Sequence, residues 1–541
     1  MTLDTKESFA PLLEWTLISW NNISQAVKEQ MYIMTQNIPA FAHHIEPVKN
    51  YWDFERIKKE INVFLTENFS HLLKEKTPDF ILGFEQGNIS KYKTSHDLEK
   101  VDLMELLILK NKFYIEILKN IVVFWKLDIL FNAEQKGDLI HMIESWVFWF
   151  LDELYLEWYK QIYDKKNAWI TSEKLAYGWV KDGKIVPLKD LLEREIKIDD
   201  SKLSQIQNTH IREYLLAFSY FIKNGITDYD TWVNAEIHEV KSWQERKEIF
   251  WIVAPMEEYM YPWVLVEPEL IIFLKNAEKK VHFEDFYWLS ERYFQDRFWM
   301  DSMTLDFVET LLQTGDAAFS WFIWKAFPND RELSQREWNC IILKDTNMKN
   351  VVHNAEKGMK ALLWEDFQLN FDALYNELIK EVTYHEFWHS LFIKWHPTSL
   401  LEEAKATLFY YLQVYSENQE FTYTRDDRKR IIEFTLMDSI RNLERMNETS
   451  AKKYVILTQM NLAYLFESGL VYWENAKLII NTTDEITFYT FLRGLKDMLF
   501  MIQELYALDE VSLQQAEIKI LEKIERYAGE NIQKMQEVLS K

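Results

Sequence analysis

Two adjacent stretches decide the fold: residues 370–394, NFDALYNELIKEVTYHEFWHSLFIK, and residues 400–416, LLEEAKATLFYYLQVYS. In both, apolar residues recur at the i, i+3, i+4 and i+7 spacing of an amphipathic helix. The break between them contains Pro397, and Thr398 or Ser399 can cap the second helix. Because the connection is short, the sequence predicts two antiparallel helices in contact.

The rest of the chain has the same helical character. Residues 102–127, 138–160 and 482–508 show helical periodicity, and ten prolines among 541 residues fit a mostly helical chain. Strand signals are few and local. Hairpins are expected over residues 175–188, around Asp-Gly, and over residues 469–481, with a short apolar strand at 340–344. We therefore expect a mainly α fold with small β elements.

A soft boundary divides the sequence at residues 196–207, IKIDDSKLSQIQ, a polar stretch of mixed charge. We place a helical N-terminal region at residues 1–205 and the region that carries the chemistry at residues 206–541.

Charge and cysteine content exclude several classes of protein. The net charge of −24 argues against nucleic acid and anionic membranes as partners, because both need clustered Lys and Arg. Residues 425–430, RDDRKR, mix both signs and are interpreted as a solvated turn. A single cysteine, Cys340, excludes a disulfide framework and a cysteine-based zinc site. No signal peptide and no apolar span of about 20 residues is recognised, so we expect a cytoplasmic protein.

The chain is rich in tryptophan and poor in glycine, with 22 Trp and 11 Gly. Average usage predicts about 38 glycines in a chain of this length. Several tryptophans, such as Trp338, Trp388 and Trp395, stand where local sequence favours glycine. We hypothesise that the source reads the codon UGA as glycine, and that many positions written here as Trp are Gly in the native protein.

The motif that carries chemistry is His385-Glu386-Phe387-Trp388-His389, an H-E-x-x-H sequence within an expected helix. Spacing i, i+4 places both imidazoles on one helical face, so both can bind one metal ion. Glu386 is the candidate general base, since it can reach a water at the metal.

A third ligand is expected from the start of the next helix. Antiparallel packing brings Glu402 and Glu403 near His389. One of these carboxylates can complete a His2Glu zinc site, and the other can hydrogen-bond a ligating histidine. His396, in the connecting turn, is a rival third ligand.

These segments resemble the zinc signature of the dipeptidyl peptidase III family, in its bacterial H-E-x-x-H branch. The likeness rests on HEFWHSLF at residues 385–392 and LLEEAKATLFYYL at residues 400–412, and it extends over about residues 257–509. Further matching segments follow the family's order: residues 257–263, 304–347 and 453–470. The resemblance implies a two-lobe zinc metallopeptidase, with a cleft between the lobes and zinc on a mostly helical lobe.

The resemblance also implies roles for individual residues. His385, His389 and Glu403 would bind one zinc ion per chain, Glu402 would orient a ligand, and Glu386 would activate the water. Asn329 would bind the substrate, Glu257 would hold the peptide's free amine, and Tyr259 would stabilise the tetrahedral intermediate. The expected partners are short peptides, and the expected state is a monomer.

The sequence departs from the family at several positions. Ala326 stands where the family has an asparagine, Trp338 where it has a glycine, and Thr449 near the place of a histidine that assists the reaction. The leading interpretation is an exopeptidase that releases N-terminal dipeptides. The alternatives are another zinc hydrolase or an endopeptidase on the same site, or a non-catalytic peptide-binding homologue.

Overall fold

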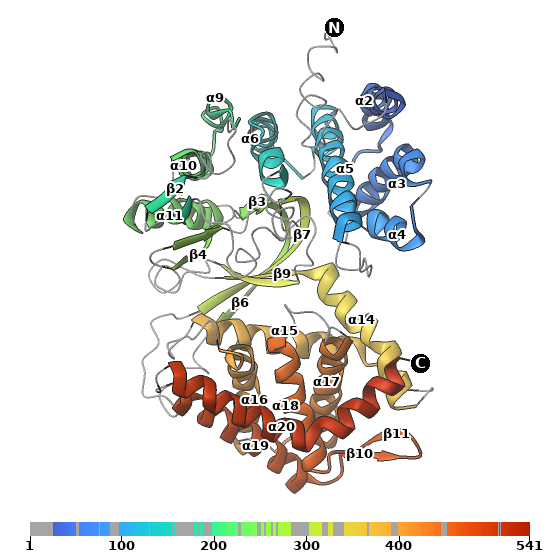
Figure 1. Ribbon diagram of the computed structural model, residues 1–541, viewed down its shortest axis with the longest axis vertical. Coiled ribbons are helices and arrows are strands. Elements are labelled where there is room, and N and C mark those ends of the chain that lie inside the picture. The colour runs from blue at the N-terminus through green and yellow to red at the C-terminus, as the bar shows by residue number, and fades with distance from the viewer. Residues whose placement is uncertain are drawn as a thin grey trace. The chain divides into compact units, whose positions relative to one another are not determined.

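The computed structural model describes residues 25–49, 53–74, 76–86, 97–128, 130–153, 156, 178–181, 184–187, 197–224, 229–245, 250–253, 256–260, 263–266, 269–282, 302–315, 323–327, 340–364, 367–390, 399–420, 422–444, 452–506, 508 and 510–540. These residues form mainly helices with small sheets, which confirms the expectation of a mainly α chain with small β elements (Figure 1).

The chain forms two compact units. Unit 1 comprises residues 1–278, 307–322 and 328–338, and unit 2 comprises residues 279–306, 323–327 and 339–541. The polar stretch at residues 196–207 lies inside unit 1. Among the described residues, none of the helices is long and apolar enough to cross a bilayer.

Unit 1 contains a group of packed helices and two small hairpins. Helices α2, α3 and α4 pack against the long helix α5, and α10 packs against α11. The helices and short strands of unit 1 are α2 (Gln25–His44), α3 (Asp53–Leu73), α4 (Pro78–Gln86), α5 (Asp97–Val123), α6 (Ala133–Glu144), β1 (Gly178–Lys181), β2 (Lys184–Pro187), α9 (Asp200–Leu203), α10 (Thr209–Asn224), α11 (Tyr229–Glu245), β3 (Phe250–Val253), β4 (Met256–Met260) and β5 (Trp263–Val266).

Unit 2 is a helical bundle with a short hairpin, drawn from yellow to red in Figure 1. Helix α16 packs against α15, α18 and α19, and α17 packs against α14 and α18. The elements are β8 (Trp324–Phe327), β9 (Cys340–Lys344), α14 (Asp345–Leu362), α15 (Phe371–Ser390), α16 (Glu402–Glu420), α17 (Arg425–Glu444), α18 (Lys452–Glu467), β10 (Val471–Glu474), β11 (Lys477–Ile480), α19 (Glu485–Leu505) and α20 (Glu510–Leu539).

Helix α16 is the core of this bundle. From Leu401 to Ser416 every side chain is buried except that of Glu403, which is partly exposed. A helix that is buried all round needs neighbours on every face, and α15, α18 and α19 supply them. Within residues 401–416, Glu403 is therefore the one residue whose side chain stays partly accessible to solvent.

One sheet is larger than the sequence predicts. Five strands form a sheet in the order β3-β6-β7-β9-β8, and its longest members are β6 (Glu269–His282) and β7 (Ser302–Gly315). The expectation of only small, local strands missed these two. Half of β6 reads NAEKKVH, which contains Ala, Glu and Lys, residues that favour helices in isolation. Pairing within a sheet overrides that preference.

The short β elements agree with the sequence-based prediction. Strands β1 and β2 pair as a hairpin, as do β10 and β11, and β9 covers the expected apolar strand. In the second hairpin the turn residues are Asn475 and Ala476, both with positive φ. Positive φ at both central residues is the pattern of a type I′ turn, which matches the twist of the flanking strands.

Two helix ends carry tryptophan where the backbone favours glycine. Trp125 follows α5 with φ 64°, and Trp146 follows α6 with φ 70°. The Trp125 N–H donates to Val122 O at 3.0 Å and the Lys126 N–H to Ile121 O at 3.1 Å, which is the Schellman pattern of helix termination. Glycine dominates this left-handed position because a bulky side chain strains it.

The break at Trp146 corrects the expected continuous helix over residues 138–160. Helix α6 ends at Glu144, Ser145 forms its C-cap, and helical structure resumes at Val147. Tryptophan gives no helix-stop signal in a sequence, so the interruption was not predicted. By contrast, Trp324 and Trp473 lie in strands, where the backbone does not require glycine.

We expect Trp125→Gly to be more stable than Trp125→Ala by about 1 kcal/mol, because only glycine removes the strain of the left-handed conformation. Both variants lose the contact between the indole ring and Lys136 Nζ, 4.7 Å from the ring centroid, so that loss cancels in the comparison. Urea unfolding of the two variants measures the difference. Equal stability would show that the backbone at this position does not need glycine.

Candidate metal centre

The H-E-x-x-H motif lies in the last turns of α15. His385 is 3% exposed, Glu386 is half-buried, and Phe387 is buried. Phe387 stacks on Phe409 of α16, which fixes the rotation of α15 about its own axis. His389 belongs to the same helix one turn later, so its backbone position suits the i, i+4 pairing; its side chain lies outside the described residues.

Helices α15 and α16 are antiparallel, as expected from their short connection. Contacts pair His385 with Glu403, Glu381 with Thr407, and Glu377 with Tyr410. Residue numbers fall along α15 while they rise along α16. The first turn of α16 therefore lies beside the H-E-x-x-H end of α15.

The structure brings His385 and Glu403 together. Nε2 of His385 lies 3.3 Å from Oε2 of Glu403. Two ligand atoms bound to one zinc ion at ordinary distances and a tetrahedral angle lie about 3.4 Å apart. These two residues therefore fit the nitrogen and oxygen ligands of a His2Glu site. The side chain of His389 is not among the described ones. Among those that are, no three His, Cys, Asp or Glu residues lie close enough together to hold a metal ion.

Electrostatics at His385 favour positive charge. Burial alone lowers the pKa of this imidazole, but the hydrogen bond with Glu403 and the carboxylates of Glu386, Glu403 and Glu381 outweigh it and raise the pKa to about 9. Carboxylates that stabilise a proton here also stabilise a metal cation in the same place.

Glu402 makes a different contact from Glu403. Its Oε1 lies 2.6 Å from Lys405 Nζ, and both side chains are almost fully buried. Lys405 also lies over the ring of Tyr506, 4.8 Å from its centroid. The expected role of Glu402 in orienting a metal ligand stays a prediction.

Two polar residues that sequence reasoning did not select contact His385 on its other side. Nδ1 of His385 lies 2.8 Å from the hydroxyl of Thr407, which donates to Oε1 of Glu381 at 3.1 Å. Burial and the carboxylate of Asp438 raise the pKa of Glu381, while His385 opposes the shift. A sequence signal existed: Glu381 precedes His385 by one helical turn, on the same face.

Tyr454, in the first turn of α18, is a further residue that the sequence did not indicate. Its phenol hydrogen-bonds the carboxylate of Glu403. Burial, together with the carboxylates of Glu403 and Glu386, raises the pKa of Tyr454 well above its ordinary value. The phenol therefore keeps its proton and remains a hydrogen-bond donor beside the candidate ligand.

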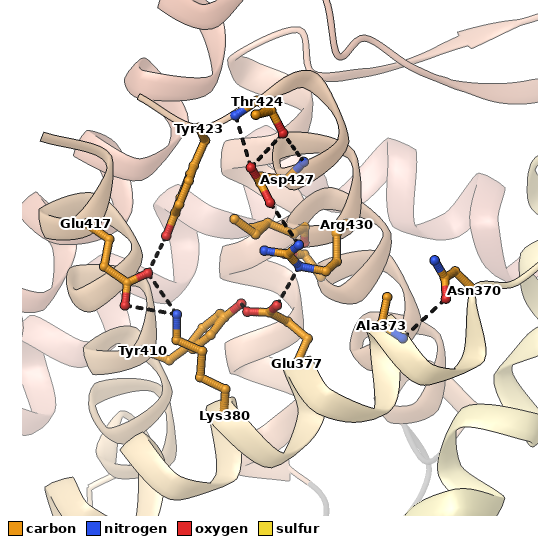
Figure 2. Close-up of polar contacts among 12 residues, drawn as sticks. Asn370, Ala373, Glu377, Lys380, Tyr410, Glu417, Tyr423, Thr424, Asp427 and Arg430 are labelled. Atoms are coloured by element: carbon orange, nitrogen blue, oxygen red, sulfur yellow. Dashed lines mark hydrogen bonds and ion pairs between the residues drawn. The ribbon is translucent and has the colours of Figure 1, made fainter. Parts of the chain in front are cut away.

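Farther along the same helices, a polar network joins α15, α16 and α17 (Figure 2). Glu377 of α15 accepts a hydrogen bond from the Tyr410 hydroxyl at 2.5 Å and one from Arg430 Nε at 2.8 Å. Lys380 of α15 pairs with Glu417 of α16 at 2.8 Å. Because each contact joins two helices, the network fixes the register between the helix with the histidines and the helix with Glu403.

The network also corrects one expectation from sequence. Residues 425–430 form the first turns of α17, not a solvated turn. Thr424 and Asp427 cap this helix reciprocally: the Thr424 N–H donates to Asp427 Oδ2 at 3.1 Å and the Asp427 N–H to Thr424 Oγ1 at 3.2 Å. This is the capping-box arrangement, and the Thr-x-x-Asp spacing was readable in the sequence.

The remaining expected site residues lie elsewhere in the chain. Glu257 and Tyr259 belong to β4, in unit 1, and the register of β4 against β5 shifts between Met256 and Glu258, so Glu257 occupies a bulge. Asn329 and His396 lie outside the described residues. Comparison with known proteins finds no family model and no curated sequence that matches this chain.

Proposed function

We propose that the chain is a zinc metallopeptidase that releases dipeptides from the N-termini of short peptides. The observation that supports this best is the placement of Glu403, which antiparallel packing brings to 3.3 Å from His385 within an H-E-x-x-H helix. His385, His389 and Glu403 would hold one zinc ion. The length of the released fragment, two residues, is inferred from the family resemblance.

The residues around the site are proposed to have different roles in hydrolysis. A bound zinc ion supplies Lewis-acid polarisation of the scissile carbonyl and lowers the pKa of water. Glu386 takes a proton from the attacking water and delivers it to the leaving amine. Tyr454 holds the carboxylate of Glu403 through its phenol. Glu257, Tyr259 and Asn329 are proposed to bind the peptide's amine and backbone.

The proposal is tested with paired peptides. A pool of short peptides and the same peptides with acetylated N-termini are incubated with zinc-loaded protein, and mass spectrometry identifies the products. We expect loss of N-terminal dipeptides from the free peptides only, because the acetyl group removes the charged amine that sets the register. Chelator-treated protein is the control for metal dependence.

Each other outcome selects an alternative. Cleavage of both peptide sets at internal bonds would keep the zinc chemistry but replace the exopeptidase with an endopeptidase. Absence of cleavage with one zinc bound per chain would favour a hydrolase with another substrate or a peptide-binding protein.

A further inference from the structure

Three buried side chains, those of His385, Thr407 and Glu381, are hydrogen-bonded in series on the side of the imidazole away from Glu403. His385 Nδ1 lies 2.8 Å from Thr407 Oγ1, and the same hydroxyl donates to Glu381 Oε1 at 3.1 Å. The exposed fractions are 3% for His385, 2% for Thr407 and 5% for Glu381. Burial of this kind excludes water as a substitute partner, so these groups satisfy one another.

The direction of the hydrogen bonds determines where the imidazole proton lies. A threonine hydroxyl has one hydrogen to donate and lone pairs that accept. Thr407 uses its hydrogen on Glu381, and only its lone pairs remain for His385. When Glu381 is ionised, Nδ1 of His385 therefore carries the proton that it donates to Thr407. In the neutral ring this leaves the lone pair on Nε2, the atom that faces Glu403.

We propose that Thr407 and Glu381 are positioning residues that hold His385 in its Nδ1-protonated tautomer, with the Nε2 lone pair directed to the metal position. The inference rests on the proposed zinc site. Outer partners of ligating histidines fix ring orientation and tautomer in this way, and their loss typically weakens metal binding 10- to 100-fold.

Position along the helices supports the assignment. Glu381 lies one turn before His385 on α15, and Thr407 lies one turn after Glu403 on α16. The helix pair that presents His385 and Glu403 thus also presents the two positioning residues, one from each helix. The register that the Glu377–Tyr410 contact fixes keeps all four aligned.

The test compares isosteric variants. Thr407→Val removes the hydroxyl and keeps the shape, whereas Thr407→Ser keeps the hydroxyl. Thr435→Val is the matched control, since Thr435 is fully buried and its hydroxyl meets Tyr411 OH at 2.9 Å. Zinc affinity is measured by competition with a chelator, and the 15N shifts of the His385 ring in metal-free protein, followed to a pH at which the ring is neutral, report its tautomer.

We expect Thr407→Val to bind zinc about 10- to 100-fold more weakly and to lose the single Nδ1-protonated tautomer. Thr407→Ser should restore both properties, and Thr435→Val should change neither. The inference is overturned if Thr407→Val keeps the affinity and the tautomer of the wild type. Should that variant not fold, Glu381→Met removes the acceptor of the Thr407 proton and is judged by the same two readouts.

The two readouts separate this inference from the proposed function. Absence of zinc binding in the wild-type protein would refute the proposed metal site, while the tautomer in metal-free protein would still decide the roles of Thr407 and Glu381. Normal zinc binding and peptidase activity, with an unaltered tautomer in Thr407→Val, would refute the positioning roles alone.

Discussion

Glu386→Gln should lose peptide hydrolysis by a factor of about 10² to 10⁴ while it still binds one zinc ion per chain. Glutamine has the shape of glutamate but does not accept a proton from water at neutral pH. Glu386 follows His385 on α15, and its half-buried side chain lies near the candidate ligand set without belonging to it. Loss of a general base lowers kcat, and metal binding does not depend on it.

Steady-state kinetics on a cleaved peptide and metal content after dialysis measure the two properties. Glu356→Gln, at a partly exposed position on α14, controls for the loss of one negative charge from an acidic protein. Full activity in Glu386→Gln would exclude the proposed mechanism. Loss of zinc together with activity would instead make Glu386 a ligand.

Lys405→Met should destabilise the protein by about 3–5 kcal/mol, which is a large part of the stability of an ordinary domain. Lys405 Nζ lies 2.6 Å from Glu402 Oε1, and the two side chains are 2% and 3% exposed. Methionine fills the space of the lysine stem but removes the positive charge beside Glu402, while the neutral phenol of Tyr506 still hydrogen-bonds this carboxylate in a low-dielectric interior. Removal of one partner from a buried ion pair is costly for this reason.

Urea denaturation measures the change in unfolding free energy, and the matched control is Lys360→Met. Lys360 pairs with Glu356 at 2.8 Å, but the two side chains are 43% and 38% exposed, so we expect a much smaller effect. The double variant Glu402→Gln, Lys405→Met should recover much of the loss. If Lys405→Met is no less stable than the control, the buried ion pair does not contribute the expected stability.

Three helices of unit 2 and the antiparallel packing of two of them were predictable because their signals are local. Periodic apolar residues indicated α15, α16 and α19, and the i, i+4 spacing of the histidines fixed their face on α15. A short connection was enough to predict that α16 returns beside α15. These signals brought both Glu402 and Glu403 near the histidines, and the preference for Glu403, which lies 3.3 Å from His385, came from the family resemblance.

The partners behind the site were not predictable in the same way. Thr407 and Tyr454 gain their roles from contacts made across helices, and nothing in their local sequence distinguishes them from other buried residues. The long strands β6 and β7 were missed for a related reason. Their residues become strands through pairing with the other strands of the five-stranded sheet.

Whether residue 125, with its left-handed backbone, is natively tryptophan or glycine can be read from the mass of one peptide. Trypsin cleaves after Lys119 and Lys126, so Trp125 falls in the short peptide NIVVFWK, residues 120–126, with no other tryptophan. If glycine occupies this helix end in protein isolated from its natural source, the peptide is lighter by the difference between an indolylmethyl side chain and a hydrogen atom. A peptide of the heavier mass would show that the native residue at the end of α5 is tryptophan, held in a strained left-handed conformation.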